Sequence, residues 1–276
     1  MLRTACIVVL LLVLGGCTGS RSASPSPAAG TQSGPSATVS RAPAPPAPPR
    51  RGACYRLTAG QLARPTNGSR PVPCTGVHTA RTIFVGRLDT VVDGHSVAVD
   101  SATVQRQLST ACPRRLATYV GGSAGSRDLS RFNVVWWSPT LAQSDRGADW
   151  FRCDLIAFSG PNTLLPLPRK GSLQGVLGRP GALGTYGLCG TAAPGTARFQ
   201  RVICSRTHSW RALTTIPLAG STYPGVRTVR AGGDARCKAA AKAVARNTLK
   251  FTYGWEWPTA DQWAGGQHYG YCWVPA

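Results

Sequence analysis

Two short patterns pair a cysteine with a histidine, the residue types that bind zinc in proteins. They are Cys74-Thr-Gly-Val-His78 and Cys204-Ser-Arg-Thr-His208. A structural zinc site takes four closely spaced ligands, whereas each place here offers one pair and the chain has no Cys-x-x-Cys. Cysteines outside the cytoplasm usually form disulfides. We therefore expect each histidine to hydrogen-bond a turn beside a disulfide, with no metal and no other cofactor.

A third pattern, Gly121-Gly-Ser123-Ala-Gly125, matches the Gly-x-Ser-x-Gly turn of serine hydrolases. That turn must link a strand to a helix, but a helical pattern precedes it here. The chain also has only ten acidic residues, so paired carboxylates are scarce. A loop is the better interpretation, and we expect no catalytic residues. An envelope hydrolase is the alternative, which a pocket joining Ser, His and Asp would favour.

The elements that position these residues occur twice. The segment Phe132–Cys153 and the segment Phe251–Cys272 share one frame, 119 residues apart and without a gap. The shared motif is Pro139, Thr140, Gln143, Gly147 and Cys153 in the first segment, and Pro258, Thr259, Gln262, Gly266 and Cys272 in the second. Such special residue types at fixed offsets predict two tandem copies of one small domain.

The cysteines follow the same repeat. Of ten cysteines, Cys6 and Cys17 lie at the N-terminus, and each copy holds four in matching order. Eight cysteines allow 105 pairings, but similar copies should pair alike and internally. The predicted disulfides are Cys54–Cys74, Cys112–Cys153, Cys189–Cys204 and Cys237–Cys272. Each contributes about 3–4 kcal/mol by restricting the unfolded chain.

The pattern of apolar residues predicts an α+β fold, in which each copy has an antiparallel sheet with one longer and one short helix. In the first copy we expect strands at 81–88, 132–137 and 150–158, a helix from Asp100 or Ser101 that Pro113 kinks or restarts, and a short helix from Pro139-Thr140 to near Gly147. In the second copy, Gly232-Gly233 and a capping Asp234 predict a helix at 235–249.

The strand of the second copy places an aromatic row on one side, formed by Phe251, Tyr253, Trp255 and Trp257. This row is either a core face, which is the usual role of such a row, or the lining of a binding groove. The first copy has Ser138 and Ser144 where the second has Trp257 and Trp263. We therefore expect those two tryptophans to form a surface specific to the second copy.

The N-terminus has the features of a targeting segment. Residues 1–16 predict a signal peptide, with Arg3 before an apolar run that is too short to span a bilayer. Leu14-Gly15-Gly16-Cys17 is similar to a bacterial lipobox, in which the cysteine is lipidated, for example with palmitate; an ordinary secretory signal is the alternative. Residues 17–50, rich in Ser, Pro and Ala, predict a disordered tether. The expected location is the extracytoplasmic side of the cell membrane.

The remaining chain divides into a first copy at 51–158, a linker at 159–187 and a second copy at 188–276. The formal charge is +21, and +20 without residues 1–16, which contain one arginine. Such a charge favours an anionic cell-wall polymer or lipid headgroups as partner, or no specific partner at all, beside the membrane contact of the N-terminal lipid. Nucleic acid is not expected outside the cell.

A tethered, Pro-rich N-terminus followed by Val-Pro-Cys-x-x-x-His and Pro-Thr-x-x-Gln-Trp-x-x-Gly resembles the septum formation domain of actinobacterial envelope proteins. The resemblance implies a non-enzymatic module that contacts a polymer or a division protein near the septum. Family members carry an acidic residue three positions after the histidine, where this chain has Arg81 and Arg211. These two arginines, with Trp257 and Trp263, are the candidate binding residues.

Replacing the lipobox cysteine tests the anchor. The variant Cys17→Ala cannot be lipidated, so it should leave the membrane fraction or accumulate as an unprocessed precursor. Membrane fractionation and the migration of the protein on a gel measure both effects. An unchanged fractionation and migration would show that Cys17 is not the anchor.

Overall fold

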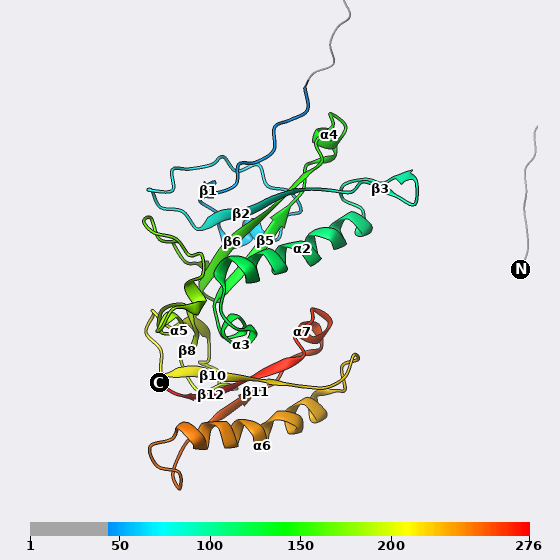
Figure 1. Cartoon of the computed structure of the whole chain (residues 1–276). Helices are drawn as coiled ribbons and strands as arrows, with labels where there is room; N and C mark the ends of the chain where they lie inside the picture. Colours follow the sequence, from blue (N-terminus) through cyan, green and yellow to red (C-terminus); the bar gives the residue numbers. More distant parts are fainter. Residues whose placement is uncertain (1–43) are drawn as a thin grey trace, which may run out of the picture. The chain divides into compact units, whose positions relative to one another are not determined.

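Two antiparallel sheets form the framework of residues 44–276, the part of the chain that the computed structural model describes (Figure 1). These residues belong to one compact unit. The predicted signal peptide, Cys17 and most of the predicted tether lie outside the described residues. Across residues 44–276, every helix falls short of the length or apolarity that a bilayer crossing requires.

The first sheet has the strand order β1-β2-β6-β5, with β7 paired to β6. Its strands are β1 (Cys54–Tyr55), β2 (Ala80–Arg87), β5 (Phe132–Trp137), β6 (Trp150–Gly160) and β7 (Thr163–Leu164). The helices of this half are α1 (Ala59–Leu62), α2 (Ala102–Val120), α3 (Ala124–Asp128) and α4 (Leu141–Ser144), and β3 (Val91–Val92) and β4 (His95–Ser96) form a separate hairpin. The predicted strands therefore form, at nearly the predicted bounds.

The second sheet has the strand order β11-β12-β10-β8-β9. Its strands are β8 (Leu188–Gly190), β9 (Arg201–Ile203), β10 (Trp210–Pro217), β11 (Gly254–Glu256) and β12 (Tyr269–Pro275), and its helices are α6 (Val226–Val244) and α7 (Ala260–Ala264). Read from the edge strand, β5-β6-β2-β1 and β11-β12-β10-β8 have the same connectivity. Register shifts also match, between Thr82 and Phe84 in β2 and between Ala212 and Thr214 in β10. The chain thus has the predicted α+β class with antiparallel sheets.

A disulfide ties the long helix to the sheet in each half. Cys112 of α2 bonds Cys153 of β6, and Cys237 of α6 bonds Cys272 of β12. The other two disulfides are Cys54–Cys74 and Cys189–Cys204, so the pairing is the one that the sequence predicts. The apolar core between α2 and the first sheet includes Val104, Leu108 and Leu155. A smaller cluster between α6 and the second sheet includes Ile216 and Trp255.

The short motif shared by both halves builds the turn into a short helix. Thr140 and Gln143 form a capping box at α4, and Thr259 and Gln262 form one at α7. In each box the threonine hydroxyl accepts from the glutamine backbone N–H, and the glutamine side chain accepts from the threonine backbone N–H. Gly147 and Gly266 end the turn with φ values of 85° and 90°, where other residues are strained. The motif is thus explained by backbone geometry.

Two helices differ from prediction. The helix α6 begins at Val226, so Gly232-Gly233 and Asp234 lie inside it and do not cap it. The reason is packing: Gly233 lies against the Trp255 indole, where a side chain has no room. The helix α2 has the predicted cap at Ser101 and runs through Pro113 to Val120, so it does not restart at the proline.

The segment at 159–187, which was predicted to be a linker, forms regular structure and packs into the core. It continues β6, adds β7, and contains the 3₁₀ turn η1 (Val176–Gly178) and α5 (Ala182–Tyr186). Leu167, Leu173 and Leu177 are buried in the core beneath α2. Gly171, Gly175 and Gly181 have positive φ values, so they supply the sharp turns that let these apolar residues pack.

A buried ion pair lies on the face of the first sheet opposite α2. Arg152 Nε is 3.2 Å from Asp154 Oδ2, and both side chains are almost fully buried. Thr82 Oγ1 donates to Asp154 Oδ1 at 2.7 Å, and Arg152 donates to Asn67 Oδ1 at 2.9 Å. Burial raises the pKa of Asp154 to about 6, which the positive charge of Arg152 opposes. The second sheet has Tyr271 and Trp273 at these two positions of the repeat.

Removing one member of this pair should destabilise the fold more than removing both. Asp154→Leu leaves a buried Arg152 without its counter-charge, which costs about 3–5 kcal/mol, whereas the double variant Arg152→Met, Asp154→Leu should recover most of that loss. Urea unfolding of both variants measures the difference in the free energy of unfolding. A single variant as stable as the double one would contradict the interpretation.

Candidate binding groove

A groove of about 680 Å³ lies between α6 and the edge strand of the second sheet. Four residues of α6 line one side, and the other side comes from the aromatic row beside and within β11. The lining residues are Arg227, Arg230, Ala231, Asp234, Tyr253, Trp255 and Trp257. We call this site the α6–β11 groove. Because β11 has only β12 as a neighbour in the sheet, the groove borders an open sheet edge.

Trp255 forms the floor of the groove and joins its two sides. The side chain is 7% exposed, and its Nε1 donates to the Val229 carbonyl of α6 at 3.3 Å. The indole lies between Gly233 of α6 and Gly270 of β12, and a Cβ at either glycine would overlap it. Trp255 also stands directly opposite the disulfide-bonded Cys272 in the strand register. The disulfide and the two glycines therefore fix the distance of α6 from the sheet.

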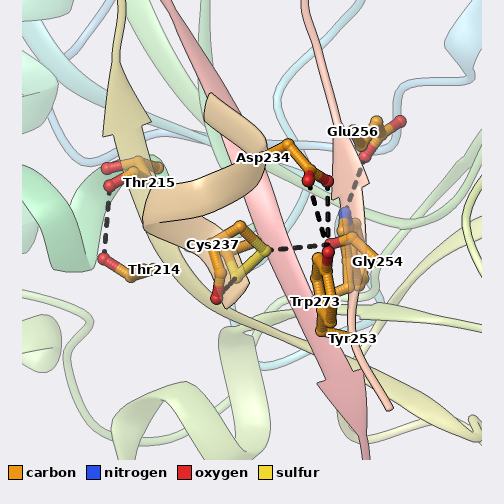
Figure 2. The surroundings of a disulfide bond; sticks show 9 residues. Thr214, Thr215, Asp234, Cys237, Tyr253, Gly254, Glu256 and Trp273 are labelled. Carbon is orange, nitrogen blue, oxygen red and sulfur yellow. Dashed lines mark hydrogen bonds between the residues drawn. A yellow bond between two sulfur atoms is a disulfide. The ribbon is translucent and has the colours of Figure 1, made fainter. Parts of the chain in front are cut away.

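Tyr253 and Asp234 form a hydrogen-bonded pair across one end of the groove. The tyrosine hydroxyl donates to Asp234 Oδ2 at 3.3 Å and lies 3.4 Å from Oδ1, one turn of α6 from the disulfide at Cys237 (Figure 2). Desolvation and the negative charge of Asp234 raise the pKa of Tyr253, so the hydroxyl keeps its proton. Asp234 is thus hydrogen-bonded within the protein, and it is the one acidic residue of the groove lining, against two arginines.

Trp257 and Arg230 form the opposite part of the groove. The Arg230 guanidinium lies over the Trp257 ring at 5.3 Å from its centroid, a cation–π contact. Arg227 lies one helical turn before Arg230, and α6 as a whole carries five basic side chains and one acidic one. The groove therefore combines aromatic surface with two arginines, a combination that suits a ligand with negative charge and a flat or ring-shaped part.

The equivalent place in the first sheet has different chemistry. A cavity of about 380 Å³ lies beside β5, and its lining includes Gln105, Val134 and Trp136. The repeat of the cysteines aligns Gln105 with Arg230, and Ser138 aligns with Trp257. Gln105 donates to the Ser138 hydroxyl at 3.3 Å, where the second sheet has the arginine–tryptophan contact. The arginine–tryptophan contact thus occurs in the second half and not at the aligned positions of the first.

Trp257 and Trp263, which were expected to form one surface, lie in different environments. Trp257 is half-buried and lines the groove, so it stays a candidate binding residue. The expectation for Trp263 is wrong, because this side chain is only 3% exposed. Its ring stacks on His268 at 4.4 Å, and its Nε1 donates to the Ser221 carbonyl at 3.3 Å. Trp263 therefore packs α7 against the loop before α6 and is not a binding residue.

Arg81 and Arg211, the other two candidate binding residues, lie outside the groove. Arg81 is in β2 and Arg211 in β10, and each faces a strand neighbour of its own sheet. Arg211 is exposed and borders a separate cavity that also contains His208. The two arginines therefore do not converge on one site with Trp257.

The two histidines contact turns, as the sequence indicates. His78 Nδ1 lies 3.0 Å from the Gly76 carbonyl, and His208 Nδ1 lies 2.7 Å from the Arg206 carbonyl. The neighbouring Cys74 and Cys204 are in disulfides, so neither supplies a thiolate for a metal. Within residues 44–276 no three His, Cys, Asp or Glu side chains gather into a metal-binding group.

Ser123 of the Gly-x-Ser-x-Gly pattern caps a helix. Its hydroxyl accepts from the Ser126 backbone N–H at 3.0 Å at the start of α3, and α2 ends at Val120 just before it. The strand–turn–helix arrangement of a hydrolase nucleophile is therefore not formed at this serine.

Comparison with known protein families identifies the family of this chain. The family model described as "Septum formation" matches residues 123–272, which is more than half of the 276 residues. The chain belongs to the septum formation family. The matched region contains β5 and β6 of the first sheet and nearly all of the second, including the α6–β11 groove. No curated protein and no solved structure matches the chain.

Sequence reasoning missed Arg227, Arg230 and Asp234 as groove residues. The signal was present, because Arg227, Arg230 and Asp234 recur at helical spacing of three and four residues. It was hidden because the expected helix started at residue 235, after these three. Tyr253 and Trp257 were placed correctly on one side of their strand, and Trp255 takes the core role while its neighbours line the groove.

Two neighbouring glycines of α6 offer a matched test of the groove floor. Gly233→Ala places a methyl group against the Trp255 indole and should cost about 1–3 kcal/mol of stability. Gly232→Ala meets only the flexible end of Leu218 at 3.3 Å, so it should stay within about 1 kcal/mol of the original or stabilise the helix. Urea unfolding followed by tryptophan fluorescence measures both. Equal effects of the two variants would contradict the packing of Trp255 described above.

Proposed function

We propose that this member of the septum formation family is a non-enzymatic binding module of the cell envelope. In this proposal Cys17 carries a lipid, residues 17–50 tether the folded part to the membrane on its extracytoplasmic side, and the two halves are tandem copies of one domain. The common strand order of the two sheets and the shared cysteine order support the duplication. The four disulfides suit an oxidising compartment, which supports export.

The ligand that we propose is an anionic cell-wall polymer near the division septum. The observation that carries this proposal is the α6–β11 groove, where Arg227, Arg230 and Trp257 lie together on a chain with a formal charge of +21. Arginine binds anionic groups through several hydrogen bonds, and an exposed indole provides a flat apolar surface for a sugar ring. The septal location rests on family membership, and the anionic character rests on charge.

The tandem arrangement gives the two halves different tasks in this proposal. In the first half Gln105 and Ser138 form a neutral contact, whereas the aligned positions of the second half hold Arg230 and Trp257 in the groove. The second half would bind the polymer, while the first half would hold it at the end of the tether. This division explains why only one copy carries Trp257.

Substitutions in the groove should weaken binding to purified cell-wall material. Trp257→Ala and Arg230→Gln each remove one side of the cation–π contact, so each should lower the affinity of the soluble fragment Arg51–Ala276 about five- to tenfold. Arg236→Gln is the matched control. It lies on the same helix and removes the same charge, but its guanidinium donates to the Pro217 and Gly232 carbonyls and does not line the groove.

Sedimentation with wall fragments across a range of salt concentrations measures these affinities. A polymer held by charge should bind more weakly as salt rises, because the screening length falls from about 8 Å at physiological ionic strength to about 3 Å at 1 M. If Arg236→Gln weakens binding as much as Arg230→Gln, attraction depends on net charge alone and the groove is not the site. An absence of binding at every salt concentration would remove the polymer as the ligand.

A further inference from the structure

A second cavity, separate from the α6–β11 groove, has a lining rich in hydrogen-bond donors. It measures about 440 Å³, and its polar lining consists of Arg131, Asn133, Gln200 and Arg201. Phe158 and Phe199 form apolar walls. Among the described residues that line this cavity, none is acidic. Two guanidinium groups and two carboxamides therefore face a space with no negative charge in its walls.

Arg131 is held in place by backbone carbonyls and has no counter-charge. Its Nε donates to the Phe158 carbonyl and its Nη2 to the Gly160 carbonyl, both at 3.1 Å. The ion pairs within residues 44–276 do not include Arg131. Burial, together with the positive charge of Arg201, lowers the pKa of Arg131 to about 10, so the group stays protonated at neutral pH. A partly desolvated cation of this kind is stabilised when an anion binds beside it.

Arg201 is also held in place, by a carboxylate and by the Tyr271 ring, whose centroid is 4.9 Å from the guanidinium carbon. Its Nη2 and Nε donate to Glu256 Oε1 at 2.9 and 3.2 Å, and Glu256 in turn accepts from Trp273 Nε1 at 3.0 Å. Both guanidinium groups thus use Nε and Nη2 for contacts within the protein. The Nη1 group of each arginine remains for a ligand. One carboxylate offsets two guanidinium groups, so the pair keeps a net positive charge.

We propose that Arg131 and Arg201 form a binding site for a phosphate group, with Asn133 and Gln200 as further donors. Arginine matches phosphate because its planar group presents several N–H donors to the oxygens of one anion. Phosphate is favoured over a single carboxylate because four donor side chains surround the cavity and a phosphate group offers more acceptor oxygens to meet them. The residues differ from those of the groove, so the site does not depend on the function proposed for the groove.

Calorimetric titration of the full chain in a non-ionic detergent tests the site with inorganic phosphate as the first probe. The unmodified protein should bind phosphate, and Arg131→Gln and Arg201→Gln should each weaken binding about tenfold or more. Arg131→Lys, which keeps the charge and loses the planar fork, should also weaken it. Arg211→Gln removes the same charge from an exposed position outside the cavity and should change the affinity less than about twofold. Thermal unfolding checks that each variant is folded.

Two further probes distinguish the source of the phosphate. A soluble polymer of glycerol phosphate represents the wall, and mixed micelles containing phosphatidylglycerol represent the lipid surface. Binding of either probe that is lost in Arg131→Gln and kept in Arg211→Gln supports the site and assigns its source. Absence of binding to all three probes, or equal loss in Arg131→Gln and Arg211→Gln, would overturn the proposal.

Discussion

The disulfide between the long helix and the strand next to the sheet edge is the constraint on which both halves depend. In each half it places a helix above the sheet at a fixed height, and the residue facing the bridged cysteine on the edge strand is a tryptophan. Trp136 faces Cys153, and Trp255 faces Cys272. Chains of this size bury modest cores, so a covalent link between layers contributes a large share of their stability. Once the helix is fixed, the space beside the edge strand is also fixed.

This common frame allows the two halves to differ in the lining of that space. In the second half, Gly233 lets α6 approach Trp255 closely, and Arg230 and Trp257 meet at the groove. In the first half, Gln105 and Ser138 make a neutral contact at the aligned positions. The first half also differs on the face of its sheet opposite α2, where Arg152 and Asp154 form a buried ion pair. The two halves therefore differ at the groove-lining positions and at a buried polar cluster, while they share the strand order.

Much of the fold follows from local patterns in the sequence. The capping boxes at Thr140 and Thr259 and the strands at 132–137 and 150–158 depend on near neighbours and on alternation, which a sequence displays directly. The disulfide pairing followed from the matched order of the cysteines. The start of α6 was missed because glycine disfavours the interior of a helix, and only tertiary packing against Trp255 explains why Gly233 lies within one.

The remaining differences come from contacts that are distant in the chain. Trp263 is buried because it stacks on His268 and donates a hydrogen bond to Ser221. Comparing the two copies in the sequence shows only that the second copy has this tryptophan and the first does not. The segment 159–187 was predicted to be a linker, but its leucines pack into the core. Arg131 and Arg201 are 70 residues apart, so no local pattern could bring them to one cavity. By contrast, Arg152 and Asp154 are two residues apart in β6, so their side chains lie on the same face of the strand. This proximity can be predicted from the sequence alone.

Hydrogen–deuterium exchange with and without purified wall polymer tests whether the α6–β11 groove binds the polymer, because it reports which backbone amides a ligand protects. Bound polymer should add protection in α6 (Val226–Val244) and β11 (Gly254–Glu256) and leave the aligned helix α2 (Ala102–Val120) unchanged. Protection spread evenly over both halves, or confined to segments away from α6 and β11, would contradict the assignment of the α6–β11 groove as the binding site.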